Sequence, residues 1–158
     1  MEIGFGTGNL IEEMAGHLQN GIIEGIDFSE TMVDVAQRKN KKYIDKGKVK
    51  IRLGDFNDMP FDDDCFDKIY SVNTIYFWKN PKAGIARIHD ILKPGGKLVL
   101  GFHDKEQMDK MSLNEDVFRY YSTRDVADLL SNDGLLNKVD IISRKGKQNA
   151  LHCAVGIK

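Results

Sequence analysis

The sequence is poor in the residues that mark several classes of protein. Its 158 residues include only two cysteines, Cys65 and Cys153, which are far apart and lack metal-ligand spacing. No apolar run approaches the length of a membrane span, and we expect no signal peptide. With a formal net charge of −1, no overall field draws the chain to nucleic acid or an anionic membrane. We therefore expect a cytoplasmic protein with reduced thiols, no membrane contact and no nucleic-acid partner.

Positive charge is concentrated in one segment, residues 38–52, which holds eight basic residues and one acid, Asp45. Such a run can contact phosphates, but no set of aromatic residues for stacking on bases accompanies it. We favour a solvated helix end followed by an edge strand that its lysines protect.

Short strands and helices alternate along the rest of the chain. Strands are predicted at residues 21–27, 48–55, 66–72 and 97–102, and helices follow Gly8 and cover residues 29–43, 81–92 and 122–134. This alternation is typical of a parallel sheet covered on both faces. The last two strands, near residues 139–144 and 150–157, lack a helix between them and should pair antiparallel. We expect a single domain over residues 1–158.

Three glycines, Gly4, Gly6 and Gly8, form a loop before the first predicted helix, and Asp27 and Asp55 each end a predicted strand. In an open parallel sheet, ligands bind beyond the carboxyl ends of the strands. A glycine turn lets a ligand approach the backbone, and an acid that ends the second strand can accept both ribose hydroxyls. These residues predict an adenosine site, with Asp55 placed for the adenine amino group.

Two cofactors contain the adenosine that such a site would bind. An NAD site should have a third glycine at position 9, where this chain has Asn9. Glu2 stands directly before the loop, and its carboxylate would repel a pyrophosphate but attract an ammonium or sulfonium group. The pattern favours S-adenosylmethionine.

The segments "EIGFGTG", "GIDFSETMVDVAQRK", "GDFNDMPFDDDCFDKIYSVNTIYFW" and "ILKPGGKLVLGF" together resemble class I S-adenosylmethionine-dependent methyltransferases. The resemblance is greatest to the broad group related to the ubiquinone and menaquinone biosynthesis methyltransferases. It implies an α/β, Rossmann-like, doubly wound and mostly parallel sheet of order 3-2-1-4-5-7-6, with strand 7 antiparallel. It also implies in-line methyl transfer to a small-molecule acceptor. The alternative is a catalytically weak binding or regulatory module on a methyltransferase core.

The resemblance further implies which residues hold the cofactor. Those near its methionine end and ribose are Glu2, Gly4, Phe5, Gly6, Gly8, Asp27 and Asn73. Those near its adenine are Phe28, Met32, Asp55 and Phe56. Two of these have plain structural alternatives, because Met32 is also suited to a core and Glu2 to a frayed terminus.

No residue is identified as catalytic, since the cofactor supplies the reactivity and the protein supplies position and electrostatics. His103 and Tyr76 are the candidates, because His103 follows the fifth strand and could take a proton near neutral pH. A hydrogen-bonded rim histidine and aromatic packing under the loop are the alternatives. Residues 103–121 are expected on the acceptor side, and the acids at 62–64 as a solvated turn rather than a metal site.

The family's first strand is central, and this chain supplies only "MEI" of it, without the upstream helices. We expect an N-terminally incomplete core. It could be a fragment of a longer protein, the product of a misplaced gene start, or a natural product that binds its cofactor poorly.

Overall fold

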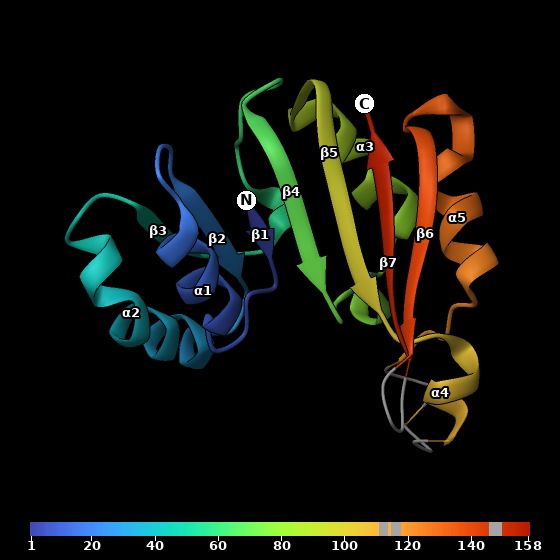
Figure 1. Ribbon diagram of the computed structural model, residues 1–158, viewed down its shortest axis with the longest axis horizontal. Helices are drawn as coiled ribbons and strands as arrows, with labels where there is room; N and C mark the ends of the chain where they lie inside the picture. The colour runs from blue at the N-terminus through green and yellow to red at the C-terminus, as the bar shows by residue number, and fades with distance from the viewer. Residues whose placement is uncertain (111–113, 115–117, 146–149) are drawn as a thin grey trace. The chain divides into compact units, whose positions relative to one another are not determined.

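The alternation of strands and helices that the sequence predicts is present in the computed structural model, which describes residues 1–110, 114, 118–145 and 150–158. The chain divides into two compact units, Met1–Pro60 and Phe61–Lys158 (Figure 1). The expectation of a single domain stays a prediction. Residues 111–113 and 115–117 of the expected acceptor-side segment, and the turn at residues 146–149, lie outside the described residues.

The first unit contains three strands and two longer helices. Its elements are β1 (Glu2–Ile3), α1 (Asn9–His17), β2 (Ile23–Asp27), α2 (Glu30–Ile44), β3 (Val49–Leu53) and the 3₁₀ turn η1 (Phe56–Asp58). β2 pairs in parallel with both β1 and β3. Ser29 caps α2 as its sequence position predicts, because its side chain accepts a hydrogen bond from the Met32 N–H at 3.4 Å.

The core of this unit forms where apolar residues of helical and strand spacing meet. It consists of Phe5, Ile11, Ala15, Ile23, Val33, Ala36 and Val49. Phe5 comes from the glycine loop itself, so the loop is fastened to the core through a large apolar side chain.

The second unit contains the remaining four strands. Its elements are β4 (Phe66–Val72), η2 (Ile75–Phe77), α3 (Pro81–Ile91), β5 (Leu92–Phe102), α4 (Lys105–Lys110), α5 (Thr123–Ser131), η3 (Asn132–Gly134), β6 (Asn137–Lys145) and β7 (Ala150–Ile157). α3 and α5 contact each other and pack on β5, β6 and β7, while α4 lies at the end toward which β4 and β5 point (Figure 1).

Seven strands in the order β3-β2-β1-β4-β5-β7-β6 make up the sheet. β4 and β5 are parallel, whereas β7 is antiparallel to both β5 and β6. The predicted strand order and the antiparallel seventh strand are confirmed. "MEI" does form a strand, because Glu2 pairs with Gly25 and Ile3 with Ile26.

β5 begins at Leu92, five residues before the predicted start at Lys97. Leu92 pairs with Phe66, and the backbone N–H of Gly95 and carbonyl of Gly96 bond to Lys158 at 3.1 and 3.0 Å. The segment "KPGG" therefore ends α3 as predicted, but it also belongs to β5, with Gly95 at a left-handed φ of 77°. The sheet supplies backbone partners for it that the local sequence does not reveal.

Candidate functional site

Three glycines with left-handed backbone conformations form the loop between β1 and α1. Gly4, Gly6 and Gly8 have φ values of 69°, 52° and 73°, a region that other residues rarely adopt. The Gly4 N–H donates to the carbonyl of Ile26 at 2.8 Å, and the Gly8 N–H donates to the carbonyl of Phe5 at 2.9 Å. The loop is thus tied both to the end of β2 and to itself.

The Asp27 carboxylate links this loop to the turn after β2. Its Oδ2 accepts a hydrogen bond from the Gly6 N–H at 2.9 Å, and its Oδ1 accepts one from the Ser29 N–H at 3.0 Å. The residue is only 8% exposed. A carboxylate can accept about four hydrogen bonds, so Asp27 can hold the loop and still accept from two further donors.

Gly6 and Gly8 differ in the space around them. A Cβ added at Gly6 would meet no atom within 4 Å, whereas one at Gly8 would lie 2.8 Å from both the Ala36 Cβ and the Asn40 Nδ2. Gly8 is therefore required for packing against α2, and Gly6 borders open space.

Asn40 is a contributor that sequence reasoning missed. It is fully buried, and its Nδ2 donates to the carbonyls of Gly8 at 3.1 Å and Ala36 at 3.0 Å. The available signal was its spacing, because Val33, Ala36 and Asn40 fall on one helical face and the first two are core residues. An amide on an apolar face indicates a buried polar partner.

Phe28 and Met32, expected beside adenine, flank the capping residue Ser29. The Phe28 side chain is 76% exposed, and Met32 is half-buried rather than part of the core. An aromatic side chain this exposed offers a flat face on which a heterocycle could stack.

Asp55 and Phe56 lie at the start of η1. Asp55 is exposed, and its Oδ1 accepts from the Asn57 backbone N–H at 2.9 Å and from the Asn57 side chain at 2.8 Å. Phe56 is buried, so only its backbone is placed to meet a ligand. Their roles at the adenine edge stay predictions.

Glu2 is not a frayed terminal residue. It lies in β1, pairs with Gly25 and is 3% exposed. Phe5, as a core side chain, could contact a ligand only through its backbone.

In the second unit, Asn73 follows β4 and has a left-handed φ of 57°. It is exposed, and its backbone N–H donates to the Gly101 carbonyl at 2.8 Å. The Tyr76 hydroxyl donates to the Asn73 Oδ1 at 3.4 Å. Asn73 and Tyr76 therefore form one cluster, as their shared position after β4 predicts.

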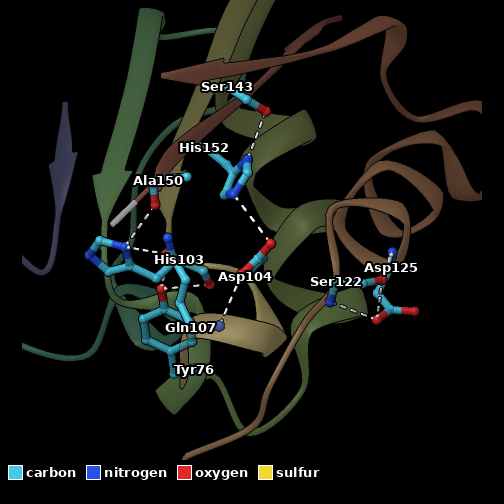
Figure 2. A network of polar contacts seen from close by, with 9 residues as sticks. All are labelled: Tyr76, His103, Asp104, Gln107, Ser122, Asp125, Ser143, Ala150 and His152. Carbon is cyan, nitrogen blue, oxygen red and sulfur yellow. Dashed lines mark hydrogen bonds and ion pairs between the residues drawn. The ribbon is translucent and has the colours of Figure 1, made fainter. Parts of the chain in front are cut away.

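The Tyr76 hydroxyl is engaged with the backbone of His103. It accepts from the His103 N–H at 2.5 Å and lies 3.2 Å from the His103 carbonyl (Figure 2). Tyr76 is 3% exposed, and burial raises the pKa of its hydroxyl. Tyr76 is therefore suited to hold His103 in place and unsuited to act as a base.

Among the residues that the structure describes, the imidazole of His103 has two partners, both on its Nδ1. This atom lies 3.0 Å from the Gln107 Oε1 and 3.1 Å from the Ala150 carbonyl oxygen. Figure 2 shows the other ring nitrogen, Nε2, pointing away from these partners. The alternative of a hydrogen-bonded rim histidine therefore describes only the Nδ1 side of the ring.

A second histidine, His152, extends this network. Its Nδ1 lies 2.8 Å from the Ser143 Oγ, and its Nε2 lies 3.4 Å from the Asp104 Oδ2 (Figure 2). The other carboxylate oxygen of Asp104 accepts the Gln107 N–H at 3.1 Å. Sequence reasoning missed His152, although its place among the buried alternate residues of β7 was a signal.

A hollow of about 510 Å³ lies between α4 and residues 118–120, lined by Lys105, Asp109, Phe118, Arg119 and Tyr120. The backbone N–H of Arg119 donates to the Tyr76 carbonyl at 3.1 Å, which anchors Arg119 to η2. The hollow is wide open to solvent, and charged and aromatic groups form its walls.

The basic segment 38–52 is engaged in local contacts. Lys41 pairs with Asp45 at 2.9 Å, Lys42 with Glu12 at 3.2 Å, and Arg52 with Glu24. Within the described residues, no helix is long and apolar enough to cross a membrane. In the same part of the chain, no cluster of three or more His, Cys, Asp or Glu side chains could hold a metal ion.

Comparisons with known proteins agree with this architecture. The chain is 34% identical over 106 residues to the uncharacterized methyltransferase YdaC of Bacillus subtilis, an alignment covering 67% of this chain and 56% of that protein. It is 31% identical over 101 residues to the ubiquinone/menaquinone biosynthesis C-methyltransferase UbiE of Geotalea daltonii, covering 63% of this chain and 43% of UbiE. The chain therefore matches only about half the length of these relatives.

A solved structure shows the same fold along almost the whole chain. The N-methyltransferase NodS of Bradyrhizobium japonicum, in complex with S-adenosyl-L-homocysteine, superimposes with a TM-score of 0.78 at 18% identity, covering 99% of this chain and 76% of NodS. The methyltransferase domain model matches residues 1–100, which include the glycine loop, Asp27, Asp55 and Tyr76. The chain belongs to the methyltransferase domain family.

Proposed function

We propose that this chain transfers a methyl group from S-adenosylmethionine to a small-molecule acceptor. The observation that carries the proposal is the hydrogen bond from the Gly6 N–H to the Asp27 Oδ2 at 2.9 Å. It fixes an acceptor-rich carboxylate beside a glycine loop that borders open space. Membership of the methyltransferase domain family supports the reaction type.

The groups around this loop fit the cofactor's chemistry. Two vicinal ribose hydroxyls need acceptors, and Asp27 retains capacity for two more hydrogen bonds. The cofactor's methionine end carries an ammonium group, which the Glu2 carboxylate would attract. The exposed ring of Phe28 can stack on adenine. We infer that Gly4, Gly8, Met32, Asp55 and Asn73 complete the cofactor's surroundings, along with the backbones of Phe5 and Phe56.

When bound, S-adenosylmethionine supplies a methyl group on a positively charged sulfur. An electron-rich atom of the acceptor can attack the methyl carbon in line and displace the sulfur. The chain's own contribution is to bind and orient the reactants. We propose that the acceptor binds in the hollow of about 510 Å³ beside α4, where the cations of Lys105 and Arg119 lie with the carboxylate of Asp109.

We also propose that the protein is cytoplasmic and has no nucleic-acid partner. Cys65 and Cys153 are free thiols, which suits a reducing compartment. Several cations of the basic segment already have local partners, as the Lys41–Asp45 and Lys42–Glu12 pairs show.

The test is calorimetry with S-adenosylhomocysteine on the wild-type chain, Asp27→Ala and Asp34→Ala. Removing Asp27 should delete two charge-assisted hydrogen bonds to ribose, about 2–4 kcal/mol, or about 30- to 700-fold in affinity. Asp34 is an exposed acid on α2, and its replacement should leave the affinity unchanged. Circular dichroism establishes that each variant is folded.

Two outcomes would contradict the proposal. Unchanged affinity in a folded Asp27→Ala chain would remove the ribose assignment. A thermal shift with NAD but none with S-adenosylhomocysteine would move the chain to pyrophosphate cofactors. Methyl transfer itself is measured by mass spectrometry, with methyl-labelled S-adenosylmethionine and a pool of small amines, phenols and carboxylic acids.

A further inference from the structure

We propose that β6 is a docking edge for a second copy of this chain, whose own β6 pairs with it antiparallel about a two-fold axis at Ile142. Such pairing concerns the assembly of the protein and goes beyond its proposed reaction. The backbone, the exposed side chains and the charges that carry the proposal all belong to one strand of the second unit.

The backbone of β6 has a strand partner on one side only. β6 comes last in the strand order, after β7, with which it pairs antiparallel (Figure 1). Among the described residues, no backbone hydrogen bond joins residues 140–144 to an element other than β7. The N–H and C=O groups on the outer side of this segment can therefore pair with another strand.

α5 covers one face of β6 and β7 and leaves the other face exposed. It contacts both strands, and the buried residues of β7, His152 and Ala154, indicate the face that it covers. Ser143 also lies on this face, because it pairs with His152, yet it is exposed. The middle of the β6 edge is therefore accessible beside α5.

Three exposed side chains alternate along the other face of β6, namely Asp140, Ile142 and Arg144. Ile142 is 61% exposed. Asp140 and Arg144 are four residues apart, so their Cα atoms are separated by about 13 Å, too far for an ion pair within the strand. In the part of the chain that the structure describes, neither has an ion pair, and their opposite residues on β7 are the apolar Val155 and Leu151.

A two-fold axis at Ile142 gives each of these side chains a suitable partner. In antiparallel pairing about this axis, Ile142 meets Ile142 of the second copy, and Asp140 of each copy meets Arg144 of the other. One apolar contact is thus flanked by two ion pairs, both of which are favourable across an antiparallel pair. Because the contact uses the same edge of both copies, it closes at a dimer.

Charges on an edge strand commonly oppose pairing, and β3, the edge strand of the first unit, illustrates this. Lys50 and Arg52 are exposed cations on either side of Ile51. Pairing of two copies about Ile51 would bring Lys50 of one copy opposite Arg52 of the other, which is unfavourable. The charges of β6 differ because they have opposite signs at equal distances from its central apolar residue.

The test is analytical ultracentrifugation at neutral pH and low salt, with chain concentrations up to about 1 mM, because so short a contact gives a weak dimer. We expect the wild type to dimerise. Arg144→Glu and Asp140→Arg should each weaken dimerisation by about tenfold or more, since each places like charges opposite one another in both flanking pairs. Lys50→Glu is the matched control, because it reverses one exposed charge on β3, and it should leave dimerisation unchanged.

Mixing the two weakened variants identifies the pairing itself. An equimolar mixture of Arg144→Glu and Asp140→Arg should dimerise about as strongly as the wild type, because each flanking pair of the mixed dimer joins an acid to an arginine. The double variant Asp140→Arg/Arg144→Asp should also dimerise, since the exchange keeps both pairs. A contact elsewhere on the chain predicts neither recovery. Circular dichroism establishes that each variant is folded.

Three results would overturn the proposal. They are a wild type that stays monomeric over the whole concentration range, a dimer that either charge reversal leaves intact, and single variants that remain monomeric when mixed. None of these measurements contains S-adenosylhomocysteine. Failure of cofactor binding would therefore refute the proposed function and leave the docking edge untouched.

Discussion

Gly6 and Gly8 allow the two roles of the glycine loop, packing and ligand contact, to be separated by equivalent substitutions. Both residues have left-handed backbones, with φ of 52° and 73°, so an alanine at either position costs about 1–2 kcal/mol in conformation. Only at Gly8 does the new Cβ also collide with α2, at 2.8 Å from Ala36 and Asn40. Such overpacking costs about a further 1–3 kcal/mol.

Because the conformational cost is shared, the difference in unfolding free energy between the variants isolates the packing of Gly8. Gly8→Ala should be less stable than Gly6→Ala by about 1–3 kcal/mol. Urea denaturation followed by circular dichroism measures this difference.

The affinity for S-adenosylhomocysteine should rank the two folded variants in a different order from their stability. The Cβ of Gly6→Ala would project into the open space beside the loop, where we place the cofactor. S-adenosylhomocysteine affinity in this variant should fall by about tenfold or more, equivalent to about 1.4 kcal/mol. Equal destabilisation of the two variants would refute the packing argument. Wild-type affinity in Gly6→Ala would refute the close approach of a ligand to the loop.

Two other side chains give predictions for stability and its pH dependence. Tyr76→Phe should cost about 1–3 kcal/mol, because the buried His103 N–H loses its acceptor. Burial raises the pKa of Tyr76, so its contribution to the free energy of unfolding is complete below the ordinary pKa of about 10 and is lost at higher pH. Above about pH 10, the urea midpoint should therefore fall more steeply with pH in the wild type than in the variant. Ser122→Ala should cost about 1 kcal/mol, because it removes the capping box of α5. Hydrogen bonds from Ser122 lower the pKa of Asp125, so their contribution to the free energy of unfolding is present above about pH 4 and is lost as the pH falls further. The stabilities of the wild type and the variant should therefore converge at acid pH. Equal midpoints of variant and wild type at neutral pH would contradict either prediction.

The elements and their order could be predicted because each depends on local patterns. The acid that ends β2, the cap at Ser29 and the antiparallel last strands all follow from short-range rules. The predicted end of the third strand at Asp55 is wrong by two residues, because β3 ends at Leu53 and Asp55 instead caps η1. The loop's link to Asp27 also follows from the strand order, because neighbouring parallel strands end at one edge of the sheet.

The partners of His103 could not be predicted, because they depend on register. Phe102 lies opposite His152 in the β5–β7 pairing, which brings the Ala150 carbonyl to the residue after Phe102. A shift of one residue in this register would turn His152 to the other face of the sheet. No local pattern specifies that register. The contact of Asn40 with Gly8 likewise joins residues 32 positions apart.

The hydrogen bonds of the glycine loop also bear on the kinetics of ligand capture. The carbonyl of Ile26, the Asp27 carboxylate and the Asn40 amide hold Gly4, Gly6 and Gly8 through contacts within the protein itself. A loop already in place adds no slow folding step to the encounter, so the association rate constant should be governed by diffusion and orientation. Substitutions that remove contacts to the ligand should then act mainly by shortening its residence time. Loss of the Asn40 amide is different, because it would loosen the loop itself and should slow the association step.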